Sequence, residues 1–136
     1  MALGKRDAAF KRYSTVNCDS LATGANTDVV IGAWVAPKTC FIHSIKGVAS
    51  GAAGTADPHF DVYDIGGTAA VIDDQAIAAA NTLYTATQKT AYASTVPIAA
   101  GKIFQIRGTT DNSGADKLDD LCVIIEWQAV DETIGQ

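Results

Sequence analysis

Two prolines, each placed between extended runs, constrain the fold of this chain more than any other feature. Pro37 interrupts the stretch WVAPKTCFIHSIKGVAS, residues 34–50, and Pro97 lies at the start of VPIAAGKIFQIRG, residues 96–108. Proline has no N–H to give to a β-ladder, so it occurs at strand ends and edges. The arrangement predicts strands that stop at a proline and restart in a new direction or in another sheet.

Further runs of β character fill most of the chain and are separated by Gly, Asn, Asp and Ser. The predicted strands are residues 13–19, 28–36, 39–49, 59–65, 68–73, 83–96, 102–108 and 121–130. Gly66 and Gly67 predict a hairpin over residues 59–73. The alanine-rich stretch 73–84 is either one short helix or a surface loop, because its apolar stripe is weak. Seven to eight short strands with at most one short helix predict an all-β fold, a single antiparallel β-sandwich that is jelly-roll-like.

The stretch DVVIGAWVA, residues 28–36, is apolar on both of its faces. Strict alternation places Val29, Ile31, Ala33 and Val35 on one face and Val30, Trp34 and Ala36 on the other. Both faces are therefore expected to be at least partly covered. Two interpretations of Trp34 stay open, because a tryptophan at this position is either part of the core or an anchor between subunits.

Charge divides the chain into a basic start and an acidic body. The formal net charge is −5; the first dozen residues contribute +3, which leaves −8 for the rest. The charged residues of that start are Lys5, Arg6, Lys11 and Arg12 against Asp7. We therefore expect an extended basic N-terminal arm at residues 1–13 and a β-sandwich domain at residues 14–136.

The same charge pattern bears on partners. Phosphate contacts need clustered Lys and Arg on a folded face, so the acidic body argues against nucleic-acid binding, and an acidic protein surface is the expected target of the arm. No apolar run approaches the ~20 residues that a membrane span needs. The start MALGKRDAAFKRY lacks the apolar segment of a secretory signal, so we expect the chain to fold in a cytoplasm and to bind no membrane.

Residues capable of chemistry are few and scattered. The cysteines Cys18, Cys40 and Cys122 form no CxxC or Cys/His cluster, so buried free thiols are expected. His43 and His59 lie inside predicted strands, and no sequence motif pairs either of them with a nucleophile. The sequence therefore predicts that this protein is not an enzyme.

Two acidic places offer oxygen ligands for a cation. His59 and Asp61 share a strand face, and the loop around DNSGADKLDD gathers Asp111, Asn112, Asp116, Asp119 and Asp120. Neither has the ligand spacing of a known calcium or transition-metal motif, and solvated surface is the favoured interpretation of both. We expect no metal and no cofactor.

The order of these segments resembles a known class of viral proteins. WVAPKTCFIHSIKGVAS, HFDVYDIGGTAAV, VPIAAGKIFQIRG and the final DLCVIIEWQ together resemble the small β-sandwich head proteins of tailed bacteriophages, above all capsid decoration (cement) proteins. The resemblance covers about residues 28–130 and lies in layout rather than in a diagnostic motif. It implies a virion protein on the outer capsid surface, assembled in the host cytoplasm, that bridges subunits of the major capsid protein as a homotrimer.

The resemblance also gives roles to individual residues. The cations of the arm, Lys5, Arg6, Lys11 and Arg12, would face the capsid or a neighbouring subunit, with Phe10 and Tyr13 as apolar anchors; a solubilising tail is the alternative. A different function class is a receptor- or glycan-binding module of a fibre or tail tip, for which Tyr63, Tyr84 and Tyr92 are the candidate aromatics. A small hydrolase would need His43 or His59 beside an acid or nucleophile in a cleft.

Overall fold

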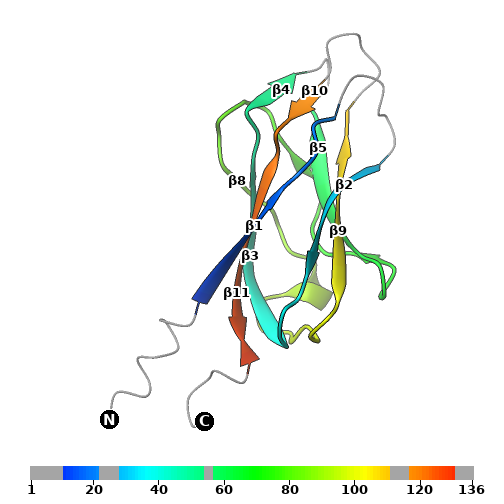
Figure 1. Cartoon of the computed structure of the whole chain (residues 1–136), viewed down its shortest axis with the longest axis vertical. Coiled ribbons are helices and arrows are strands. Elements are labelled where there is room, and N and C mark those ends of the chain that lie inside the picture. The colour runs from blue at the N-terminus through cyan, green and yellow to red at the C-terminus, as the bar shows by residue number, and fades with distance from the viewer. Residues whose placement is uncertain (1–10, 22–27, 54–56, 111–116, 131–136) are drawn as a thin grey trace.

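A computed structural model describes residues 11–21, 28–53, 57–110 and 117–130 (Figure 1). Antiparallel strands make up nearly all of its regular structure, and one 3-10 helix, η2, spans Thr90–Tyr92. The strands are β1 Lys11–Asn17, β2 Val29–Val35, β3 Cys40–Val48, β4 Gly51–Ala53, β5 His59–Asp64, β6 Ala69–Ala70, β7 Gln75–Ala76, β8 Tyr84–Thr85, β9 Ile103–Thr109, β10 Lys117–Asp119 and β11 Cys122–Ala129. The prediction of an all-β sandwich is confirmed.

The strand order is that of a jelly roll. One sheet, which we call sheet A, has the order β1-β11-β3-β8, and the other, sheet C, has the order β2-β9-β5-β6, with β7 also paired to β5. Numbered 1 to 8 along the chain, these eight strands give sheets of order 1-8-3-6 and 2-7-4-5, the interleaved pattern of a double Greek key. β4 and β10 form a separate two-stranded ribbon at one end of the sandwich (Figure 1).

Both proline-marked stretches are corners between the sheets. The chain passes from β2 in sheet C to β3 in sheet A through Pro37, and from β8 in sheet A to β9 in sheet C through Pro97. The two corners lie side by side, because Cys40 and Ile98 exchange backbone hydrogen bonds of 2.9 and 2.7 Å. Gly101 has φ +82°, a left-handed turn that glycine adopts without strain. The predicted change of sheet is confirmed at both places.

The predicted hairpin and helix have different outcomes. β5 and β6 pair antiparallel across a turn at residues 65–68, as Gly66 and Gly67 indicate. The stretch 73–84 contains the short strand β7, bends and turns instead of a helix, and Ile77 is its one fully buried large side chain. Its alanines are too small to form a helix face with enough buried area, which favours the loop alternative.

A β-bulge changes which residues of β2 face the core. The register of β2 against β9 shifts between Val30 and Gly32. Because the bulge adds one residue, Ile31 and Trp34 both point inward although they are three positions apart. Strict alternation was therefore wrong for this strand: its outer face carries Val30, Ala33 and Val35. That outer face is exposed, which corrects the expectation that both faces are covered.

The sheet begins earlier than the predicted arm boundary at residue 13. Lys11, Arg12 and Tyr13 belong to β1 and pair with Gln128, Trp127 and Glu126 of β11. The alternating side chains of KRYSTVN fit an edge strand with one half-buried face, which is why these residues join the sheet. The remainder of the predicted arm, including Lys5, Arg6 and Phe10, lies outside the described residues.

The core is filled by aromatic and branched side chains from both sheets. Trp34 is only 6% exposed and stacks on Phe104 with ring centroids 5.7 Å apart. Tyr92 meets the other side of Phe104 edge-on at 6.0 Å. Each fully buried Phe contributes about 1.5–3 kcal/mol of hydrophobic stabilisation. Of the two interpretations of Trp34, its burial corresponds to the core, and the anchor between subunits is not supported by its position.

Candidate functional site: the two outer faces of the sandwich

A buried carboxylate ties two turns together inside the sandwich. Asp64, at the end of β5, is fully buried and points inward. Its Oδ2 accepts a hydrogen bond of 2.6 Å from the hydroxyl of Tyr92 and lies 3.1 Å from the Lys102 ammonium, while its Oδ1 accepts from the N–H of Gly67 at 3.0 Å. Burial raises the pKa of Asp64, but these hydrogen bonds and the lysine charge lower it further, so the net pKa lies below its ordinary value. The four groups neutralise and satisfy one another.

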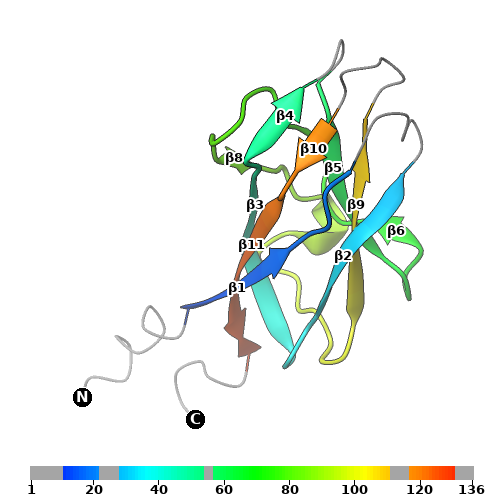
Figure 2. The ribbon, with the colours of Figure 1, turned by 45° about the horizontal axis from the view of Figure 1, so that its top comes forward.

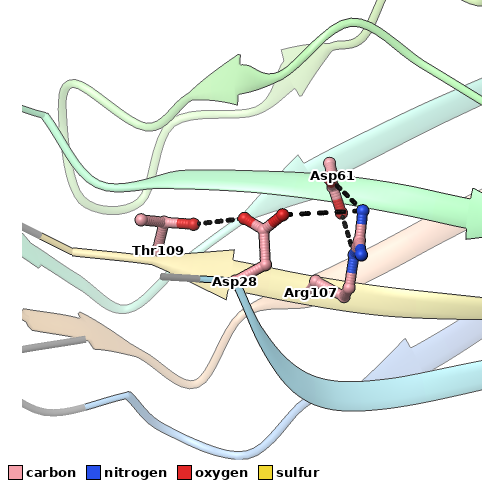
Figure 3. Close-up of polar contacts among 4 residues, drawn as sticks. All are labelled: Asp28, Asp61, Arg107 and Thr109. Carbon is pink, nitrogen blue, oxygen red and sulfur yellow. Dashed lines mark hydrogen bonds and ion pairs between the residues drawn. The ribbon is translucent and has the colours of Figure 1, made fainter. Parts of the chain in front are cut away.

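A second polar cluster lies on the outer face of sheet C (Figure 3). Arg107 of β9 donates to both oxygens of Asp61 in β5, at 3.0 and 2.9 Å, and stacks over the ring of Tyr63 at 4.1 Å. Asp28 approaches the same guanidinium at 3.5 Å and accepts a hydrogen bond of 2.7 Å from Thr109. This fork-to-carboxylate geometry clamps β5 to β9 and holds the start of β2 against them.

Both charged partners of this clamp are shifted from their ordinary protonation behaviour. Burial raises the pKa of Asp61, which is 6% exposed, whereas the hydrogen bonds and charge of Arg107 lower it; the net direction is upward. The hydrogen bonds and charge of Asp61 raise the pKa of Arg107. The sequence showed no signal for this pair, because Asp61 and Arg107 are far apart along the chain and only the register of β5 on β9 makes them direct neighbours.

The two histidines lie on opposite sheets. His43 of β3 has its Nε2 3.2 Å from the side-chain oxygen of Gln128, a neighbour on sheet A. His59 lies in β5 opposite Thr109 and is half-buried. Neither contact supplies the acid–base–nucleophile arrangement that hydrolysis by Ser or Cys requires.

The thiols of two cysteines are poor nucleophiles. Burial raises the pKa of Cys18 to about 12, with a further contribution from Cys122, and raises the pKa of Cys40 to about 11. Both are therefore protonated at neutral pH. The prediction of buried free thiols is confirmed for these two, whereas Cys122 is half-buried.

No group of three or more His, Cys, Asp or Glu able to hold a metal ion occurs in the part of the chain that the structure describes. In the acidic loop, Asp111, Asn112 and Asp116 lie outside the described residues. The carboxylate of Asp120 instead accepts hydrogen bonds from Ser20 and Ser50. Among the described residues, no helix is long and apolar enough to cross a bilayer.

The outer face of sheet A presents an exposed tyrosine on an edge strand. Tyr13 of β1 is 67% exposed, the largest exposure among the large hydrophobic side chains. Beside it, the Lys11 ammonium lies 3.5 Å from Glu126. On the opposite side of β1, Arg12 stacks over Trp127 at 5.6 Å, and the indole N–H of Trp127 donates to the hydroxyl of Ser14 at 2.9 Å. The structure thus brings three of the predicted contact residues, Lys11, Arg12 and Tyr13, together on β1.

β1 also offers an open backbone edge. The N–H of Cys18 donates to Leu121 of β11, so by alternation the N–H and C=O of Lys11, Tyr13, Thr15 and Asn17 point away from β11. β1 meets β2 only near its C-terminal end, where Asp19 donates to Ile31, and its N-terminal end runs clear of β2 (Figure 2). Such an edge is able to pair with an added strand.

The outer face of sheet C carries an exposed apolar row. Val35, Ile103 and Ile65 follow one another across β2, β9 and the end of β5, and they are 51%, 44% and 40% exposed. A shallow hollow of about 460 Å³ adjoins the row and is lined by residues 65–66 and 99–103. The sequence analysis missed this row, because alternation within each strand does not show which residues of different strands are neighbours.

Comparisons with known proteins are sparse. No family model and no curated protein matches the chain. A chain in the structure of infectious bursal disease virus Gx strain is similar, with a TM-score of 0.41 and 14% sequence identity. The alignment covers 88% of this chain and 37% of that chain, so this protein spans little more than a third of the viral chain's length. The jelly-roll assignment rests on this chain's own strand pairing.

Proposed function

We propose that this protein is a virion structural protein, a capsid decoration or cement protein. It would bind the outer surface of a capsid lattice as an oligomer, for which the resemblance to phage head proteins implies a trimer. It would stabilise the head by bridging neighbouring subunits of the major capsid protein. The observation that carries the proposal is Tyr13, which is 67% exposed beside Lys11 on an open edge strand.

The polar clusters support a structural role over catalysis. Asp64, Asp61 and Arg107 are engaged in ion pairs and hydrogen bonds that hold strands and turns together. Catalytic groups, in contrast, need to reach a substrate in a cleft with a free proton-transfer or nucleophilic atom. The exposed features of the sandwich are apolar and basic side chains and strand edges, which are means of contact with other proteins.

The capsid-facing surface would be the outer face and free edge of β1. Lys11 has a side chain that is 45% exposed and Tyr13 stands beside it, so an acidic and partly apolar surface would be complementary. The arm residues that precede β1 add Lys5, Arg6 and Phe10 to the same end of the chain. Interface energy concentrates in aromatic residues and Arg, which makes Tyr13 the expected anchor.

Jelly rolls occur in viral capsid proteins and in lectins alike, so the fold by analogy is compatible with the glycan-binding alternative as well. That alternative needs exposed aromatics grouped on one face. Tyr92 is buried, Tyr84 packs against the core, and Tyr63 is half-buried under Arg107. These three do not form an exposed platform, and we favour the capsid role.

The test is occupancy on expanded heads that lack this protein. Tyr13→Asp should reduce the bound amount strongly, whereas Leu83→Asp, at a 51% exposed position away from β1, should leave it unchanged. Removal of residues 1–10 leaves β1 intact and should weaken binding in a salt-dependent way, because exposed charges are screened. Equal occupancy of all these variants would contradict the proposed surface.

A further inference from the structure

We propose that the outer face of β2 is a two-fold contact between two copies of this chain. The inference does not depend on the capsid role, because it concerns sheet C, on the opposite side of the sandwich from β1. It starts from a strand whose sequence, VVIGAWV, is apolar on both faces although the folded chain buries only one. Strands of this composition are usually covered on both sides.

The exposed side chains of β2 form an evenly spaced column. Val30, Ala33 and Val35 lie opposite Arg107, Gln105 and Ile103, which are successive outward residues of β9. The bulge takes up the extra residue by turning Ile31 inward, so it does not disturb the spacing of the column. Val30 is 50% exposed and Val35 is 51% exposed.

Charged residues of opposite sign end the column. Asp28 lies at one end, held by Thr109, and Lys38 is exposed just beyond Pro37 at the other. The surroundings carry the same signs. Near Asp28, two carboxylates against the one guanidinium of Arg107 leave −1; near Lys38, two ammonium groups, its own and that of Lys102, against the carboxylate of Asp64 leave +1.

Read along β2, the column is acid, valine, alanine, valine, base. Rotation by 180° about an axis through Ala33 places Asp28 of one copy opposite Lys38 of the other and Val30 opposite Val35, with Ala33 opposite itself. Charge and apolar character thus match under one two-fold operation, which is the requirement of an isologous interface. A partner of unrelated sequence would have no reason to share this order, so a second copy is the occupant that we infer.

The apolar row extends the contact beyond β2. Ile103 and Ile65 continue from Val35 toward the hollow at residues 99–103. At the other end of the column Val30 projects without a covering side chain of comparable size. The two-fold operation brings the projecting end of each copy toward the hollowed end of its partner, which would improve packing at both ends.

The experiment is sedimentation equilibrium of the full chain from low micromolar to about 200 µM. Wild type should show a reversible monomer–dimer equilibrium. Val35→Asp should raise the dissociation constant by at least about tenfold, because each two-fold contact contains the substitution twice. Leu83→Asp is the matched control and should not change it. Both variants should keep the wild-type circular dichroism spectrum, since both positions are exposed.

Charge exchange and crosslinking test the symmetry itself. Lys38→Asp and Asp28→Lys should each weaken the dimer, and the double variant should recover most of the affinity. Asp28 is replaceable for this purpose, because its side chain is 44% exposed and Asp61 keeps the closer contact with Arg107. Ala33→Cys should form an intermolecular disulfide under mild oxidation, and Leu83→Cys should not.

A two-fold contact by itself makes a dimer, whereas the resemblance to decoration proteins implies a trimer, and the measured mass separates the two. A monomer at all concentrations would overturn the inference, as would a trimer whose stability is unaffected by Val35→Asp. Loss of the dimer with retained binding to heads would leave the capsid role standing, and the reverse result would leave the two-fold contact standing.

Discussion

The hydroxyl of Tyr92 donates a hydrogen bond of 2.6 Å to Oδ2 of Asp64, and both side chains are buried. The bond connects η2 to the end of β5, and Lys102 joins the same oxygen from the corner before β9. Three segments that are distant in sequence therefore meet at one carboxylate. This junction holds the turns that border the apolar row of sheet C.

Loss of this hydrogen bond should destabilise the fold. Tyr92→Phe removes the hydroxyl but keeps the ring that packs edge-on against Phe104. Because a buried ionised acceptor loses a donor, the free energy of unfolding should fall by about 1.5–3 kcal/mol, measured by urea denaturation. Tyr13→Phe, at an exposed position, is the control and should change it by less than about 0.5 kcal/mol. Equal effects of the two substitutions would show that the bond to Asp64 contributes nothing.

The same carboxylate should make stability depend on pH. The pKa of Asp64 is lower in the folded protein than its ordinary value, so the unfolded chain binds more protons in acid. The stabilisation is present above about pH 4, the ordinary pKa of Asp, and is lost as pH falls through the lower folded pKa. The free energy of unfolding of wild type should therefore decrease from pH 5 to pH 2 more steeply than that of Asp64→Asn. Parallel pH profiles would exclude a linked proton at Asp64.

Arg107 should be needed most when Asp61 is ionised. Arg107→Met leaves a buried carboxylate without its fork, which at pH 7 should cost about 3–5 kcal/mol in urea denaturation. The pKa of Asp61 is raised, chiefly by burial, so the folded state takes up a proton at Asp61 more readily than the unfolded chain does. The cost of the substitution should therefore shrink as the pH is lowered to about 4.5. Arg107→Met combined with Asp61→Leu should recover part of the loss at pH 7, and a cost independent of pH would contradict this account.

Gly47 marks a place where the sheets approach too closely for a side chain. A Cβ atom there would lie 2.5 and 2.7 Å from ring atoms of Phe60, which is 1% exposed. Gly47→Ala should therefore lower the free energy of unfolding by about 1–3 kcal/mol through overpacking. Gly66→Ala is the comparison, because the nearest atom to its added Cβ is 3.7 Å away; it should cost far less in the same thermal or urea melt.

Sequence patterns predicted the architecture because corners and turns are local. Pro37, Pro97 and the pair Gly66 and Gly67 each fix the chain within a few residues, and all became corners or a hairpin. The phase of β2 failed because a bulge between Val30 and Gly32 depends on the partner strand β9. The start of β1 at Lys11 failed for a similar reason, since pairing with β11 outweighs the polar character of those residues.

The candidate surfaces were predictable only in part. Lys11, Arg12 and Tyr13 were singled out by charge and aromatic character, and the structure places them on one strand. The row of Val35, Ile103 and Ile65 depends on the register of three strands, which single-strand patterns do not contain. Trp34 looked like an equally good surface anchor until the bulge turned it toward Phe104.

Binding to a capsid tests the central claim most directly. Purified protein is mixed with expanded heads of the virus that encodes it, prepared without this protein, and the copies bound per head are counted after sedimentation over a range of concentrations. The account predicts saturable binding with a fixed number of copies per head, together with raised resistance of the heads to heat. Protein that stays in the supernatant at every concentration, or that binds without saturation and without stabilising the heads, would contradict it.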